Sequence, residues 1–254
     1  MNPLFKTLLW ISIFSIAMGF LESSVVVYLR KLYYPGGFRF PLTVIPSDIA
    51  TVEFFREAAT IIMLLGAGIL AGRNTSQRLA FFVYAFALWD VFYYIFLKLI
   101  LHWPESFQTW DILFLIPVPW VGPVLAPCIV SLTMIGLTLV ILLHSDKGFQ
   151  TRLRITEWLL LSTGSLIIIY SFCSDYLHKV LFSAKHGLIL NDKADLFSDM
   201  KAYVPEAYNW QTFSVGEIML MVAIIVYVMR LRKKEQIGIY SPECYSERHH
   251  QSPI

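Results

Sequence analysis

The chain has 254 residues, of which 57% are hydrophobic and only 15% are charged, and its formal net charge is +2. Soluble domains carry about 25% charged residues, so this composition indicates a membrane protein. The near-neutral charge and the lack of a basic stripe interleaved with aromatic residues exclude a nucleic-acid partner. The cysteines are scattered without a CxxC pair, which predicts neither a zinc site nor a disulfide framework.

Six apolar segments are long enough to cross a bilayer, which takes about 20 residues. The predicted spans are residues 8–29, 49–72, 79–101, 123–143, 155–172 and 213–231. We therefore expect an all-α, polytopic membrane domain over residues 1–232, with a cytoplasmic tail over residues 233–254. The first segment has no small-residue cleavage site, so we expect it to be a retained span and not a signal peptide.

A segment rich in Trp and Pro, Trp103–Pro127, separates the third and fourth spans. Its prolines forbid a regular helix, and the apolar run Asp111–Ile116 is too short to cross the membrane. Tryptophan favours the membrane interface, where its ring is half wet. Residues 110–122 are thus expected to form a re-entrant segment or an interfacial loop, and the sequence leaves both possibilities open.

The connections between spans indicate the orientation. Lys and Arg residues concentrate in cytoplasmic connections, and the strongest cue here is the basic run Arg230–Lys234 directly after the last span. We expect a multi-pass protein of the cell (inner) membrane with both termini in the cytoplasm. In the long outer link between the last two spans, Tyr176–Leu190 is expected to form an amphipathic surface helix.

The second span carries an unusual polar face. Glu53, Arg56, Glu57 and Thr60 follow the spacing i, i+3, i+4 and i+7, so they lie on one side of the helix. Charged groups inside a membrane are costly unless they pair or line a wet cavity. This face therefore predicts either a buried ion pair or a polar site.

Other spans place charges at matching depth. Glu22 and Arg56 each lie eight residues from the outer end of their span, about 12 Å in. Asp90 lies near the middle of the third span. The planar guanidinium of arginine can form two parallel hydrogen bonds to a carboxylate, so we expect Arg56 to pair with Glu22 or Asp90. The candidate substrate- or ion-binding residues, which include a tyrosine on the face of Asp90, are Glu22, Glu53, Arg56, Glu57, Asp90 and Tyr94.

Carboxylates outnumber bases in these spans. With Glu217, at the outer end of the last span, five acids face Arg56 and Lys98. Some of them must be protonated, hydrated or bound to a cation, which suggests a working site. The alternative is a buried group of ion pairs whose only role is to fix the register between the helices. The pattern predicts no metal site, because Asp175 and His178 are an isolated pair of possible ligands, and it assigns no cofactor.

Small residues predict close helix packing. The stripe of Ser12, Ser15, Gly19 and Ser23 on the first span and the GxxxG pair Gly68 and Gly72 on the second are of the kind that lets helices approach. We interpret the glycine pair as packing within the chain.

Three stretches carry a resemblance: GFLESSVVVYLR (Gly19–Arg30), FFREAATIIMLL (Phe54–Leu65) and WDILFLIPVPWVGPVLAP (Trp110–Pro127). They resemble segments of an uncharacterised group of prokaryotic multi-span membrane proteins. The resemblance covers the first four spans. That group has no assigned activity, so the resemblance implies no function.

Three functions remain open on these grounds. The first is transport or binding of a proton, cation or small solute at the carboxylate and arginine cluster in the outer half of the membrane. The second is a membrane enzyme acting on a lipid or lipid-linked substrate at the outer interface. The third is a non-catalytic subunit of a membrane complex. The expected partners are the lipid bilayer and either other membrane proteins or further copies of the chain.

Overall fold

The computed structural model describes residues 2–43, 45–116, 118–185 and 204–237. Its helices are α1 (Pro3–Tyr33), α2 (Ser47–Ala71), α3 (Thr75–Leu101), α4 (Leu125–Asp146), α5 (Ile155–Lys185) and α6 (Trp210–Ile237). A two-stranded hairpin, β1 (Trp110–Phe114) and β2 (Trp120–Pro123), lies between α3 and α4 in the chain. All six helices are long and apolar enough to cross a membrane, which confirms the six predicted helical segments.

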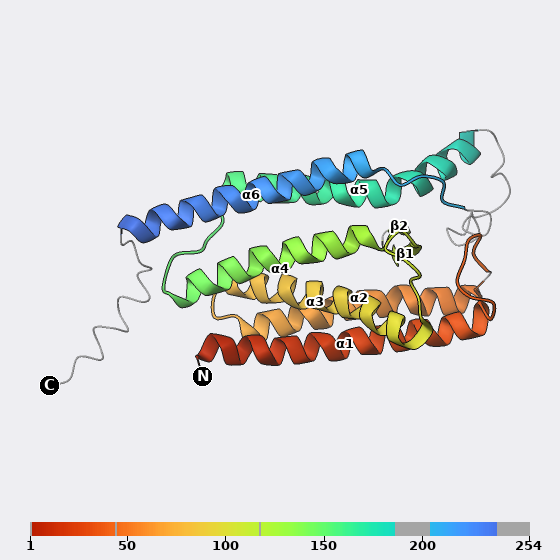
Figure 1. Cartoon of the computed structure of the whole chain (residues 1–254), viewed down its shortest axis with the longest axis horizontal. Helices are drawn as coiled ribbons and strands as arrows, with labels where there is room; N and C mark the ends of the chain where they lie inside the picture. Colours follow the sequence, from red (N-terminus) through yellow and green to blue (C-terminus); the bar gives the residue numbers. More distant parts are fainter. Residues whose placement is uncertain (1, 44, 117, 186–203, 238–254) are drawn as a thin grey trace.

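The helices lie side by side along one long axis (Figure 1). Helix α3 contacts α1, α2 and α4, while α5 packs mainly on α6, and α4 joins the two groups through its contact with α6. Helix α1 begins and α6 ends at the same end of the bundle, and the hairpin lies towards the other end (Figure 1). We call these the terminal end and the hairpin end.

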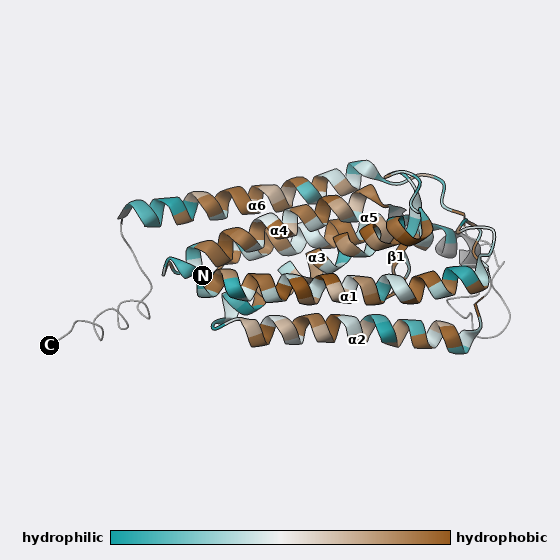
Figure 2. Cartoon of the chain, turned by 60° about the horizontal axis from the view of Figure 1, so that its bottom comes forward, coloured by the Kyte–Doolittle hydropathy of each residue, from teal (hydrophilic) through white to brown (hydrophobic). Residues whose placement is uncertain are grey.

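Hydropathy follows the same axis. Apolar residues cover most of the length of the helices, and hydrophilic residues gather at the two ends (Figure 2). Helix α2 is an exception, because a hydrophilic stretch interrupts its half nearer the hairpin end (Figure 2). That stretch belongs to the polar face of α2, whose buried residues include Glu53, Glu57 and Thr60.

Local sequence explains where several helices start. The Asn2 side chain accepts a hydrogen bond from the backbone N–H of Leu4 at 2.9 Å and caps α1, with Pro3 in the first turn. Asn74 caps α3 in the same way by accepting from Gln77 N at 3.0 Å. These caps satisfy backbone donors that the first turn of a helix leaves free.

Small residues set the contacts of α3 with α1 and α2. A Cβ atom added to Gly19 would lie 3.0 Å from the backbone oxygen of Trp89, and Ser23 Oγ donates to Tyr93 O at 3.0 Å. A Cβ atom on Gly68 would lie 2.6 Å from Phe82 N. The expected role of these small residues in packing within the chain is therefore confirmed for both helices.

The Trp- and Pro-rich segment folds as an antiparallel hairpin, so the all-α expectation is wrong for this stretch. Trp110 pairs with Pro123, Asp111 with Gly122, Ile112 with Val121 and Phe114 with Trp120. Gly122 lets the hairpin approach α5, since an added Cβ would meet the ring of Phe172 at 3.1 Å. The hairpin gives this proline-rich chain a partner for its backbone groups, which a helix could not provide.

Two expected boundaries differ from the structure. The fourth span is predicted from Pro123, but this residue belongs to β2 and α4 begins at Leu125. Helix α5 continues to Lys185, so the start of the expected surface helix at Tyr176 is an extension of the fifth span. Residues 186–190 of that helix and most of the predicted tail lie outside the described residues.

Candidate functional site

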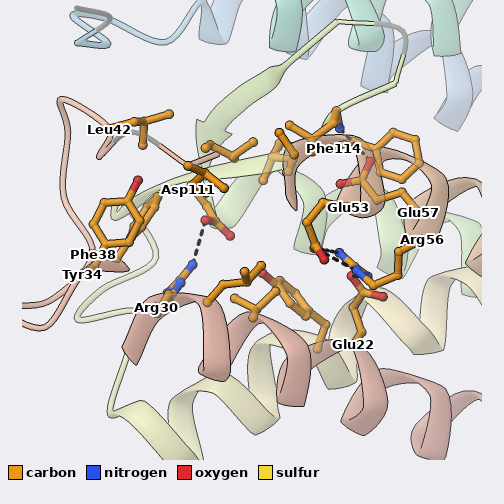
Figure 3. A pocket seen from close by; sticks show the side chains of 18 of the residues that line it. Glu22, Arg30, Tyr34, Phe38, Leu42, Glu53, Arg56, Glu57, Asp111 and Phe114 are labelled. Atoms are coloured by element: carbon orange, nitrogen blue, oxygen red, sulfur yellow. Dashed lines mark hydrogen bonds and ion pairs between the residues drawn. The ribbon is translucent and has the colours of Figure 1, made fainter. Parts of the chain in front are cut away.

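A cavity of about 180 Å³ lies between α1, α2, α3, the loop after α1 and strand β1 (Figure 3). Much of its wall is apolar, from residues such as Val26, Leu29, Phe38, Leu42 and Leu113. Its charged lining consists of five carboxylates and two arginines: Glu22, Glu53, Glu57, Asp90, Asp111, Arg30 and Arg56. The cavity therefore combines a hydrophobic wall with an excess of acidic groups.

One end of the cavity holds Glu22, Glu53, Arg56 and Glu57, which we call the acidic cluster. Arg56 Nη1 donates to Glu22 Oε1 across the gap between α2 and α1, and Arg56 Nε donates to Glu53 Oε2 at 2.9 Å. The predicted pairing of Arg56 with Glu22 is confirmed. All three glutamates are 9% exposed, so a single guanidinium serves two buried carboxylates.

The carboxylate of Glu57 forms its hydrogen bond with the hairpin and not with Arg56. Its Oε2 accepts a hydrogen bond from the backbone N–H of Leu115 at 2.9 Å, just after β1. Helix α2 thus holds the turn of the hairpin through one carboxylate. No ion pair to Glu57 is present among the described residues, so its charge has only a neutral donor as a partner.

Asp90 lines the cavity from α3 but does not pair with Arg56. Its Oδ2 accepts from Ser131 Oγ of α4 at 2.8 Å. The expected alternative pairing of Arg56 with Asp90 is therefore wrong. Like Glu57, Asp90 has a neutral hydrogen-bond partner. The two bases on the cavity wall, Arg30 and Arg56, form ion pairs with other acids.

The other end of the cavity holds a second buried ion pair. Arg30 Nη2 lies 3.0 Å from Asp111 Oδ1, and Figure 3 shows this pair set apart from the acidic cluster. The Arg30 guanidinium lies over the ring of Trp103, 3.6 Å from its centroid, and 4.3 Å from that of Phe38. Burial raises the pKa of Asp111 to about 6, although Arg30 opposes this shift.

Arg30 and Asp111 are cavity residues that the sequence pattern does not predict. Arg30 stands at the end of an apolar run, where a base normally reaches the membrane surface. Here aromatic residues from the following loop and from the end of α3 cover it. The only sequence signal is the recurrence of a charge eight residues after Glu22, about 80° around the helix and thus on the same side of α1.

Three further expectations need correction. Tyr94 is buried beside Leu97 and Trp103, and its neighbour Tyr93 lines the cavity instead. The hydrogen bond to Asp90 comes from Ser131 and not from Tyr94, and the Tyr94 hydroxyl lies beside Asp111. Glu217 accepts from Thr133 Oγ1 of α4, away from the cavity. Lys98 donates to the backbone oxygen of Pro104 at 2.7 Å and does not join the acids.

Three buried polar atoms on the cavity wall have no hydrogen-bond partner among the described residues. They are Arg30 Nη1, Asp111 Oδ2 and Trp89 Nε1. Buried polar groups are nearly always paired with protein or water. Two donors and one acceptor on residues of the cavity wall are thus unpaired.

The terminal end of the bundle offers a contrast. Arg230 of α6 donates to both oxygens of Glu157, at 2.6 and 2.7 Å, and Glu157 also accepts from Arg154 N at 2.8 Å. This carboxylate is 1% exposed and fully paired. It behaves as a lock between α5 and α6, whereas the cavity at the hairpin end contains acids without cationic partners.

The six apolar helices suit a multi-pass membrane protein, and the bundle contains a cavity lined by charged residues. No protein-family model matches the sequence, and neither a curated protein nor a solved structure matches it. Within the part of the chain that the structure describes, no three His, Cys, Asp or Glu side chains are placed to hold a metal ion together.

Proposed function

We propose that this membrane protein binds a small cation at the acidic cluster and carries it across the cell (inner) membrane. Five carboxylates and two arginines line the cavity, a formal excess of three negative charges when all are ionised. Uncompensated charge is costly inside a membrane. A proton or a cation relieves that cost, and this excess is the observation that carries the proposal.

The two acids that have no cationic partner give further support to a cation-binding site. Glu57 and Asp90 each accept a hydrogen bond from a neutral group, Leu115 N and Ser131 Oγ. If the charges served only to hold the helices together, the ion pairs of Arg56 and Arg30 would be sufficient. A buried carboxylate, Glu57, and a half-buried one, Asp90, would weaken such a connection, because each adds a desolvation cost without a countercharge. Their presence is better explained by a ligand that brings positive charge.

The size of the cavity limits the ligand. A cavity of about 180 Å³ is only slightly larger than one of about 150 Å³ that holds benzene. Pockets for drug-sized molecules are commonly about 300–1,000 Å³. This volume suits a proton, an inorganic cation or a small organic cation, and because the cavity is partly open, a lipid-linked substrate would place only one end inside it. A role as a subunit of a larger complex stays a prediction from the sequence.

The orientation is part of the proposal. The basic run Arg230–Lys234 at the end of α6 supports a cytoplasmic location of both termini, by the positive-inside rule. The hairpin end, and with it the cavity, then lies in the outer half of the membrane. Cysteine labelling at a terminal position and in the loop after α1 would test this orientation.

Transport is tested with the purified protein in liposomes. Cation-driven currents are recorded with protons, sodium, potassium and small organic amines, against protein-free liposomes. We expect one of these cations to give a current that falls at least about tenfold in Asp90→Asn and Glu57→Gln. Both substitutions keep the hydrogen-bond acceptor and remove the charge.

The matched control is Glu217→Gln, which neutralises a carboxylate on α6 outside the cavity. It should retain the current. The proposal fails if no cation gives a current, or if the two cavity variants transport as well as the wild type.

A further inference from the structure

Two atoms of the buried Arg30–Asp111 pair have no hydrogen-bond partner among the described residues. Nη2 and Oδ1 meet at 3.0 Å, while Nη1 and Oδ2 have no hydrogen-bond partner among the described residues. Arg30 is 7% exposed and Asp111 is 1% exposed, and both line the cavity. An unused donor and an unused acceptor therefore belong to the same buried pair.

We propose that the ligand of this cavity is a small amino alcohol or a related amine with a neutral polar end. Its ammonium group lies at the acidic cluster, and its hydroxyl group lies against the Arg30–Asp111 pair. This inference rests on the proposed function, since it names the class of cation that the same site takes.

The chemistry of the pair selects a neutral group that both donates and accepts. A carboxylate would suit Arg30 Nη1 but would be repelled by Asp111, and an ammonium group would have the opposite fault. A hydroxyl carries one donor and two acceptor positions. It can accept from Nη1 and donate to Oδ2 at once, and a primary amide shares this property.

The position of the pair is fixed before a ligand arrives. The Arg30 guanidinium lies against the rings of Trp103 and Phe38, which restrict its movement. The strand pairing of Asp111 with Gly122 holds the carboxylate from the other side. Groups that are already ordered lose little entropy on binding, so hydrogen bonds made here add to affinity.

The spacing of the two polar ends calls for a hydrocarbon link. Glu22 and Arg30 lie eight residues apart on α1, a rise of about 12 Å. Between them α1 contributes Val26 and Leu29 to the wall, and Figure 3 shows the two charged ends separated by other side chains. A volume of about 180 Å³ accommodates about six to ten non-hydrogen atoms by comparison with benzene in about 150 Å³.

Binding of four probes of matched size to the full-length protein in detergent would test the proposal. The probes are 6-amino-1-hexanol, n-heptylamine, 1-heptanol and 5-methoxypentylamine, and binding is measured by calorimetry against empty micelles. We expect the amino alcohol to bind about tenfold more tightly than heptylamine, the gain of one or two hydrogen bonds. The ether, which accepts but cannot donate, should fall between them.

A substitution at Arg30 tests whether this residue causes the preference for the amino alcohol. Arg30→Lys keeps the positive charge beside Asp111 but removes the second guanidinium nitrogen. It should abolish the preference for the amino alcohol while leaving heptylamine binding within about threefold. The comparison among probes on the wild type does not depend on the folding of this variant.

The outcomes separate the two proposals. Equal affinity for the amino alcohol and heptylamine, with a Glu57→Gln variant that loses both, overturns the amino alcohol and leaves the cation site. Water would then be the hydrogen-bond partner of Arg30 Nη1 and Asp111 Oδ2. Heptanol binding as tightly as the amines, or no binding of any amine together with no cation current, overturns the cation site as well.

Discussion

Arg56 of α2 reaches Glu22 of α1 and at the same time holds Glu53 on its own helix. This bridge is the main polar link between two helices that otherwise make few contacts with each other, since both pack chiefly on α3. The charge that lines the cavity thus also holds α1 and α2 together. Changes in this bridge should therefore affect both stability and binding.

Replacing Arg56 with Gln should destabilise the protein, because Glu22 and Glu53 lose the cation that compensates their burial. Removing one partner of a buried ion pair costs about 3–5 kcal/mol, and for a chain of this size that lowers the melting temperature by roughly 5–15 °C. Melting in detergent measures the effect. The double variant Arg56→Gln with Glu22→Gln should recover part of the loss, and a melting temperature equal to that of the wild type in Arg56→Gln would contradict the bridge.

Glu57→Ala should loosen the hairpin, because Leu115 N loses its acceptor. Hydrogen exchange of the peptide that contains Leu115 should become faster by about tenfold, the equivalent of one lost hydrogen bond of about 1.4 kcal/mol. Glu57→Gln keeps an acceptor oxygen and should exchange like the wild type. Equal exchange in the two variants would show that Glu57 does not hold the turn.

The face of α2 that carries the acidic cluster could be predicted because helical periodicity is local. Residues three and four positions apart share a side whatever the rest of the chain does, so Glu53 and Glu57 needed no tertiary information. The depth of Glu22 and Arg56 followed from the helical rise alone. Their pairing then required only that α1 and α2 be neighbours.

The hairpin and its ion pair could not be predicted in this way. Asp111 pairs with Gly122 across a turn, and Arg30 meets Asp111 from 81 positions away. Such contacts depend on which segments the fold brings together, and prolines near the turn only exclude a helix. The confusion of Tyr93 with Tyr94 has a smaller cause, because adjacent helical residues differ by about 100° in direction.

The stability contributed by Asp111 should fall as pH rises. Its pKa in the folded protein is about 6, above the ordinary value of 3.8, because burial disfavours the charged form. The folded state therefore binds more protons than the unfolded state in this window, so the contribution is fully present below 3.8 and is lost as pH rises through about 6.

Asp111→Asn lacks this titration, so it isolates the effect from other acids. The difference in melting temperature, wild type minus Asp111→Asn, should decrease by several degrees between about pH 4.5 and about pH 7. In the wild type, Arg30 and the Tyr94 hydroxyl face the Asp111 carboxylate, and the variant replaces it with a carboxamide that does not titrate. A difference that stays constant, or one that grows with pH, would mean that the Arg30 charge outweighs the burial of Asp111.

The close contact of α2 with α3 should tolerate no side chain at Gly68. An added Cβ would lie 2.6 Å from Phe82 N and 2.7 Å from Phe82 Cα, and these are backbone atoms that cannot turn aside. Gly68→Ala should therefore push the helices apart and cost about 1–3 kcal/mol. Gly66, two residues earlier, has no atom within 4 Å of an added Cβ. Gly66→Ala should leave the melting temperature unchanged or raise it slightly, because alanine favours the helix by about 1 kcal/mol over glycine. If both alanine variants melt alike, α2 does not rest on α3 at Gly68, and the wall of the cavity that α2 supplies is placed differently.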